Sequence, residues 1–230
     1  MPEADVLVEV FGEGKTDIGS EPKPRRPTTG VVSILLHTLC GRPANMLVKC
    51  KATQFLFNKK TLRQKVQFAK RQARYNLSHA AVFVMDSEGG PKELKQKKSE
   101  LEAGRDRELP NFPMAVGVAH PCIEAWLLAD GTAIRRGLGL PQTPKCPDEP
   151  ESLPAPCHDV ERNPKRTLCE LAGAARRELS ADEKDRIAAA MNDLALLRQR
   201  CALGFAPFAD EVENRIRPLF RTRAWRDGVS

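Results

Sequence analysis

Acidic side chains stand at the ends of three apolar runs of this sequence. Glu13 follows the first run, Asp86 and Glu88 follow a later one, and Glu124 lies just beyond the last. Carboxylates gathered in one crevice repel one another, and a divalent cation is the simplest partner that keeps them ionised. Mg²⁺ or Mn²⁺ held in this way activates water and stabilises the charge that develops on a phosphoryl oxygen. These four residues are therefore candidate catalytic groups, with Glu13, Asp86 and Glu88 as the candidate metal ligands.

Each acid also has a local explanation. Glu13 stands between two glycines in a turn, and Asp86 with Ser87 could form an Asx-turn. Glu124 would interact favourably with the positive end of its own helix. For one acid taken alone the local explanation is the stronger, but the combination of all of them favours a metal site.

The elements that must position these acids follow from the hydrophobic pattern. Apolar runs at 6–11, 80–85 and 113–118, with a shorter one at 45–49, predict buried strands, and helical periodicity separates them. Alternation of strand and helix indicates an α/β fold with a mainly parallel, Rossmann-like sheet and helices on both faces. Ligand sites of such sheets lie at the carboxyl ends of the strands. The fold therefore predicts that Glu13, Asp86 and Glu88 face one crevice.

The chain divides into three parts on the same pattern. Residues 1–131 form the α/β core, and residues 132–164, rich in proline, cysteine and acids, form an irregular excursion or lid. Residues 165–230 form a helical extension that packs on the core, with helix starts expected at Pro164 and at a Ser180–Glu183 capping box.

The charge of the chain favours a polyanionic partner. The formal net charge is +7, and the segment from Lys59 to Arg74 contains seven basic residues and no acid. Lysine and arginine side chains neutralise phosphates and release their counterions, so DNA or RNA is the expected partner. Lys15, Lys65, Arg71 and Arg74 are the candidate nucleic-acid-binding residues. The alternative is that the basic segment is a solvated helix face.

Several other classes of protein are excluded by motif or composition. No run of about 18 apolar residues is present, so no membrane span is expected. Seven scattered cysteines without a CxxC pair indicate reduced thiols, and the start of the chain is unlike a signal peptide, so we expect a cytoplasmic protein. The Gly14-Lys15-Thr16 sequence is not a nucleotide-binding P-loop, because that motif requires glycine where Glu9 stands.

Three segments together resemble a known family. Residues 11–17 (FGEGKTD) resemble the first motif of TOPRIM domains, and residues 84–89 (VMDSEG) resemble the second. Residues 121–130 (PCIEAWLLAD) resemble a helix of small stand-alone TOPRIM-like proteins of bacterial phage-defence loci, which are similar to the nuclease part of OLD-type systems. The resemblance covers roughly residues 5–130.

The resemblance implies roles for individual residues. Glu13 would be the general acid/base or a metal ligand, Asp86 and Glu88 the metal-binding acids, and Glu124 part of a second metal site. The sequence departs from the family pattern at Glu88, where aspartate is usual, and the extra methylene moves the ligand oxygens by about an ångström, near the tolerance of a catalytic site. A topoisomerase is not expected, because the only tyrosine, Tyr75, lies in the basic segment and the chain has no room for a gate domain.

These observations lead to the expectation of a metal-dependent nuclease that hydrolyses nucleic-acid phosphodiesters, with a role as a phage-defence effector implied by the resemblance. One alternative is a catalytically weak nucleic-acid-binding or regulatory module. Another is a partner subunit of an ATPase, which would expose a large apolar patch on the C-terminal helices.

Overall fold

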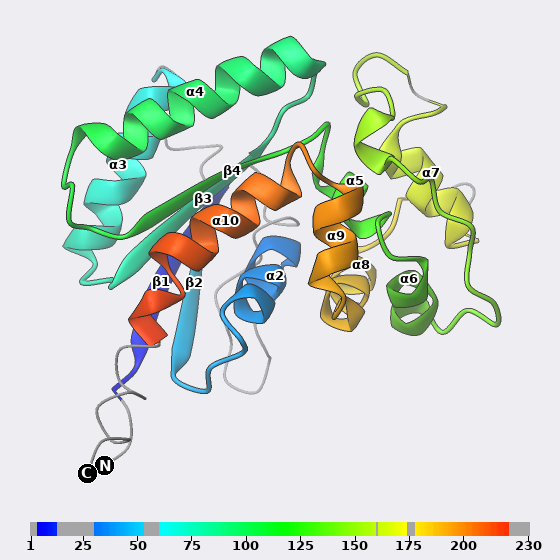
Figure 1. The fold of residues 1–230 in the computed structure, drawn as a ribbon, viewed down its shortest axis with the longest axis horizontal. Helices are drawn as coiled ribbons and strands as arrows, with labels where there is room; N and C mark the ends of the chain where they lie inside the picture. Colours follow the sequence, from blue (N-terminus) through cyan, green and yellow to red (C-terminus); the bar gives the residue numbers. More distant parts are fainter. Residues whose placement is uncertain (1–3, 13–29, 53–59, 160, 174–177, 221–230) are drawn as a thin grey trace.

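The computed structural model describes residues 4–12, 30–52, 60–159, 161–173 and 178–220. Helices and strands alternate up to β4, and helices follow (Figure 1). In chain order the elements are β1 (Val6–Gly12), α2 (Val31–Leu39), β2 (Met46–Ala52), α3 (Leu62–Tyr75), β3 (Ala80–Asp86), α4 (Pro91–Arg107), β4 (Met114–Ala119), α5 (Ile123–Leu127), α6 (Gly131–Leu138), the 3₁₀ helix η1 (Pro150–Ser152), α7 (Pro164–Leu171), α8 (Ala181–Ala190), α9 (Leu194–Arg200) and α10 (Phe205–Arg215).

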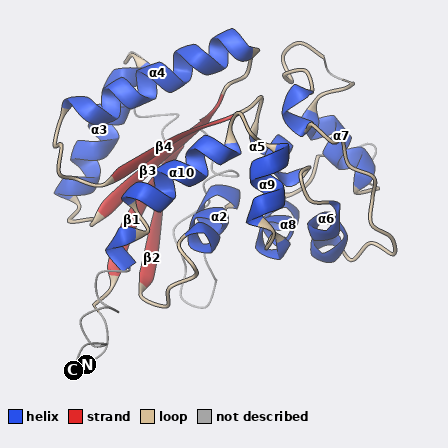
Figure 2. Cartoon of the chain, in the orientation of Figure 1, coloured by secondary structure: helices blue, strands red, loops and turns tan. Residues whose placement is uncertain are grey.

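The described strands form one sheet in the order β2-β1-β3-β4, and every neighbouring pair is parallel. Gly12 at the end of β1 pairs with Val84 of β3, and Asp86 at the end of β3 pairs with Ala119 of β4. The carboxyl ends of these strands therefore lie at one edge of the sheet. This arrangement confirms the predicted α/β fold with a parallel sheet and C-terminal helices (Figure 2).

Two apolar layers cover the two faces of the sheet. Along β3, Val82 and Val84 belong to the cluster shared with α2, α5, α8 and α10, whereas Phe83 and Met85 belong to the cluster shared with α3 and α4. This alternation is what a strand buried on both faces produces, because successive side chains point to opposite sides. Helices therefore cover both faces of the central strands β1 and β3, whereas Leu47 and Lys49 of β2 are exposed.

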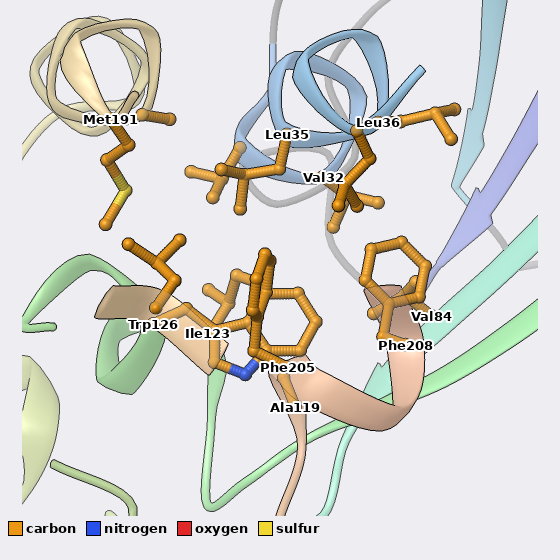
Figure 3. Close-up of a cluster of buried hydrophobic side chains, with 14 of the residues drawn as sticks. Val32, Leu35, Leu36, Val84, Ala119, Ile123, Trp126, Met191, Phe205 and Phe208 are labelled. Carbon is orange, nitrogen blue, oxygen red and sulfur yellow. The ribbon is translucent and has the colours of Figure 1, made fainter. Parts of the chain in front are cut away.

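Trp126 lies at the centre of the larger cluster (Figure 3). Its ring packs edge-on against Phe205 at 5.3 Å and stacks on Phe208 at 5.4 Å between ring centroids. Aromatic contacts of this kind add about 0.5–1.5 kcal/mol to the burial of the rings. The tryptophan thus joins α5, directly after the sheet, to α10 near the end of the chain.

Helix starts match the expected capping signals. Pro164 opens α7, and the Ser180 side chain accepts a hydrogen bond from Glu183 while Glu183 binds back, which confirms the predicted capping box. The segment after Pro121 differs from expectation, because α5 ends at Leu127 and Asp130 caps a separate helix, α6, through the Ala133 N–H. Residues 131–138 are therefore helical, and the irregular excursion starts after them.

The excursion is fixed to the rest of the fold by a buried carboxylate. Glu151, only 5% exposed, accepts hydrogen bonds from the N–H groups of Leu203, Gly204 and Phe205 at the start of α10. Burial raises the pKa of Glu151 in spite of these donors.

Of the helices described, none combines the length and apolar character needed to cross a membrane.

Candidate active site at the carboxyl edge of the sheet

Two of the predicted acids lie at the end of β3 and in the loop that follows it, and we refer to Asp86–Glu88 as the acidic loop. Asp86 is half-buried, and its Oδ1 accepts a hydrogen bond from the Ile123 N–H at 3.0 Å. Its backbone oxygen accepts a hydrogen bond from Lys97 Nζ at 2.9 Å. Because β3 lies between β1 and β4, Asp86 stands at an inner strand of the sheet, where ligands of parallel sheets bind.

Glu88 is held in a less common backbone conformation. Its φ of +53° lies in the left-handed region, which costs a residue other than glycine about 1–2 kcal/mol. A hydrogen bond from the Glu88 N–H to the Pro121 oxygen at 3.0 Å helps to hold the loop in place. The Glu88 side chain is 66% exposed, with Lys97 Nζ 3.8 Å from its Oε2. Glu88 is therefore a carboxylate that solvent can reach, next to Asp86 in the chain.

A buried Ser87–His120 pair joins this loop to the end of β4. Ser87 Oγ lies 2.8 Å from His120 Nδ1, and the Ser87 N–H donates to the Ala119 oxygen at 2.8 Å. Burial lowers the pKa of His120 from its ordinary value. The pair thus ties the acidic loop to the end of β4.

Glu124 is buried and ion-paired, unlike the exposed Glu88. Its side chain is 2% exposed, and its Oε1 forms an ion pair with Lys184 Nζ at 2.6 Å. Burial alone would raise the pKa of Glu124, but the Lys184 and Lys165 ammonium groups outweigh burial and hold the pKa below its usual value. The other oxygen, Oε2, has no hydrogen-bond partner among the described residues. A charged glutamate compensated by lysine can hold α8 against α5 without a metal.

The remaining predicted acid, Glu13, lies outside the described residues, as does Lys15. The strand before them ends at Gly12, beside Val84 of β3 and Ala52 of β2. Within the described part of the chain, no three or more histidine, cysteine, aspartate or glutamate side chains come close enough to hold a metal ion. The structure therefore places Asp86 and Glu88 close together in the chain at the end of β3. Their convergence with Glu13 stays a prediction.

Asp86 and Glu88 are oxygen donors of the type that Mg²⁺ and Mn²⁺ prefer. Mg²⁺ usually binds one or two protein carboxylates and fills its other positions with water and phosphate oxygens. Asp86 and Glu88 supply two such carboxylates, and the exposure of Glu88 leaves room for further ligands.

The predicted nucleic-acid-binding residues of α3 lie apart from this loop. Arg71 and Arg74 are exposed in the last turns of α3, and Arg71 pairs with Glu108 at 3.0 Å. Lys65 is half-buried near the start of the helix. Lys70, a member of the same basic segment, is buried and donates to the Arg105 oxygen, and burial lowers its pKa. At least one lysine of the segment therefore has a structural role.

Sequence reasoning missed several groups that contact the acidic loop. Lys97 reaches back to Asp86 across eleven residues, and the Cys157 thiol donates to the Glu88 backbone oxygen at 2.9 Å from the excursion. Lys184 binds Glu124 from 60 residues away. Helical spacing after the loop could have pointed to Lys97, but no local signal marks Cys157 or Lys184.

The fold and this loop define the class of the protein as an α/β protein with a parallel sheet and an acidic loop at its carboxyl edge. Residues 30–213 match the family described as Domain of unknown function (DUF4276), and the chain belongs to that family. No curated protein and no solved structure matches the chain. Asp86, Glu88 and Glu124 lie inside the matched region, and Glu13 precedes it.

Proposed function

We propose that the protein is a metal-dependent nuclease that hydrolyses nucleic-acid phosphodiesters, with Asp86 and Glu88 as ligands of Mg²⁺ or Mn²⁺. The observation that carries the proposal is the acidic loop after β3, which combines a half-buried and an exposed carboxylate at the edge where parallel sheets bind ligands. The TOPRIM-like sequence of this loop supports the same chemistry. The resemblance also motivates the proposal of a phage-defence effector in the cytoplasm.

Each residue of the loop has a task in this proposal. A bound divalent ion would supply an activated water and charge stabilisation at the phosphoryl group. Asp86 is oriented by the Ile123 N–H, and Lys97 fixes the backbone of the same residue. The Ser87–His120 pair ties the loop to the end of β4. Glu13 is proposed from the sequence as a third ligand or as the general acid/base.

The experiment is direct. Purified protein is incubated with labelled single-stranded and duplex DNA and RNA in Mg²⁺, Mn²⁺ or EDTA. Cleavage of at least one substrate with a divalent ion and none in EDTA is the expected result. Cleavage that persists in EDTA would contradict the proposed metal dependence.

A second candidate function is a nucleic-acid-binding or regulatory module with little catalytic power. It is favoured by the Glu124–Lys184 ion pair, because a carboxylate neutralised by lysine is less suited to a second metal. Binding without cleavage in every metal would support this candidate. The ATPase-partner hypothesis receives less support, because Leu203 is the one exposed large apolar side chain found on the described C-terminal helices and their connections.

A further inference from the structure

The first half of α4 carries a row of exposed lysines beside the acidic loop. Lys92, Lys95 and Lys98 are all exposed and stand three residues apart, so they follow one ridge of the helix. They span about 9 Å along the helix axis, at a rise of about 1.5 Å per residue. Leu94 and Leu101 anchor the helix to the sheet, which leaves the lysine row on the surface. We refer to these three residues as the α4 lysine row.

Acidic neighbours offset only part of the charge of this row. The Glu93 carboxylate binds the Gly90 N–H, and Lys92 nearby helps to lower its pKa. Lys98 lines a hollow together with Glu102, Asp210 and Glu211. Within the described part of the chain, no member of the row forms an ion pair, whereas the neighbouring Lys97 pairs with Glu88. The three exposed ammonium groups are therefore available to a phosphate.

Lys92 is the member of the row that lies in the first turn of α4, where the partial positive charge of the helix end disfavours lysine. The same partial charge adds to the attraction of Lys92 for a phosphate.

The row starts next to the candidate metal ligands. Lys92 is six residues beyond Asp86, and α4 begins where β3 and β4 end and then runs away from that edge (Figure 1). The basic end of α3 lies at the opposite edge, because Asn76 binds Glu9 near the start of the sheet. Along β3, about 20 Å separates the two edges at roughly 3.3 Å per residue. Nucleic acid held at Asp86 therefore meets α4 before it meets Arg71 or Arg74.

We propose that the α4 lysine row binds the phosphate backbone of the nucleic acid next to the bond that is cleaved. The proposal rests on the proposed nuclease function for the identity of the cleaved bond. The lysines position the strand by phosphate contact and carry no base specificity, because base sequence is read in the grooves. They would guide the nucleic acid to the acidic loop. The sequence analysis assigned this role to residues of α3.

The test uses three triple variants of the full chain that each remove three positive charges. Lys92→Gln/Lys95→Gln/Lys98→Gln removes the row, and glutamine keeps a similar helix propensity. Lys65→Gln/Arg71→Gln/Arg74→Gln tests α3. The matched control, with exposed residues on α6, the excursion and α8, is Arg136→Gln/Lys145→Gln/Arg186→Gln. Binding of labelled duplex DNA, single-stranded DNA and RNA is measured in EDTA over a series of salt concentrations, and cleavage is measured separately in Mg²⁺.

Loss of the row should flatten the slope of log affinity against log salt by about 2.7 for duplex DNA or about 2.1 for single strands, if each lysine contacts one phosphate. The corresponding loss of affinity in about 0.1 M salt is at most roughly 500-fold for duplex. The control should bind as wild type does. The proposal would be overturned if the row variant kept the wild-type slope, or if only the α3 variant showed a flatter slope. An equal loss of affinity in the control, or no binding by wild type, would also overturn it.

The outcomes separate this proposal from the nuclease proposal. If the row variant binds weakly but wild type cleaves nothing in Mg²⁺ or Mn²⁺, the binding surface stands and the nuclease proposal fails. If wild type cleaves and the row variant binds and cleaves equally well, the nuclease proposal stands and the α4 surface fails.

Discussion

Replacing Lys184 with methionine is expected to destabilise the fold by about 3 kcal/mol near pH 7–8. Lys184 Nζ lies 2.6 Å from Glu124 Oε1, and the two side chains are 12% and 2% exposed. Removing one partner of a buried ion pair costs about 3–5 kcal/mol, because the other charge stays buried. Lys165 still lies near Glu124 and partly offsets the cost of its burial, so the lower end of this range applies.

The loss should depend on pH in a defined direction. In wild type the pKa of Glu124 lies below the ordinary glutamate value of about 4.5, so its contribution to stability is present above that pH and is lost as pH falls through the lowered pKa. Without Lys184, burial becomes the stronger influence and raises the pKa, so the variant loses stability as pH rises above about 4.5. The difference between the two proteins is therefore largest near pH 8 and smallest near pH 4.

Urea unfolding at several pH values between 4 and 8 measures the free energies of unfolding. The control is Glu124→Gln/Lys184→Met, which removes both charges and should recover much of the stability lost by Lys184→Met alone. Equal stability of Lys184→Met and wild type at pH 8, or a deficit that is the same at every pH, would refute the reasoning. If Glu124→Gln keeps its stability but loses cleavage, Glu124 takes part in the chemistry as the sequence suggested.

Three further predictions concern the acidic loop and its partners. Glu13→Gln keeps the shape but removes the charge, so it should abolish cleavage with a smaller loss of nucleic-acid binding in EDTA; wild-type cleavage rates would remove Glu13 from the site. Glu88→Asp restores the acid usual in TOPRIM motifs and should preserve or raise the cleavage rate, and a large loss would show that the loop is built for glutamate. Lys97→Met removes a cation 3.8 Å from Glu88 and should tighten Mn²⁺ binding about threefold in an electron paramagnetic resonance titration, because an exposed pair contributes little. Weaker Mn²⁺ binding would instead indicate that Lys97 mainly holds the loop in shape.

Features set by local sequence could be predicted well. The apolar runs before Glu13 and after His79 gave strands that end at Gly12 and Asp86, because a continuous run bounded by turn residues suits a buried parallel strand. Pro164 and the Ser180–Glu183 box gave helix starts for a similarly local reason. The predicted start of the irregular excursion at residue 132 was wrong, because Asp130 caps a further helix, α6, through the Ala133 N–H.

Features set by distant contacts could not be predicted. The partner of Glu124, Lys184, comes from 60 residues further along the chain, and no spacing rule connects them. Lys70 belongs to a basic segment that suggests an exposed face, but packing of α3 against α4 buries it. Charge runs describe composition, and only the packed structure decides which charges face solvent.

The central claim is that the acidic loop holds the metal that drives cleavage, and Asp86→Asn tests it most directly. Asparagine keeps an oxygen that can accept the Ile123 hydrogen bond, so the loop should keep its shape while the charge is lost. Single-turnover cleavage in Mg²⁺ and binding of nucleic acid in EDTA are measured side by side. We expect the cleavage rate to fall by at least about 100-fold, because losing even an outer-sphere partner of a metal costs up to about 100-fold. Binding of nucleic acid in EDTA should be unchanged. Cleavage by Asp86→Asn at the wild-type rate would contradict the account.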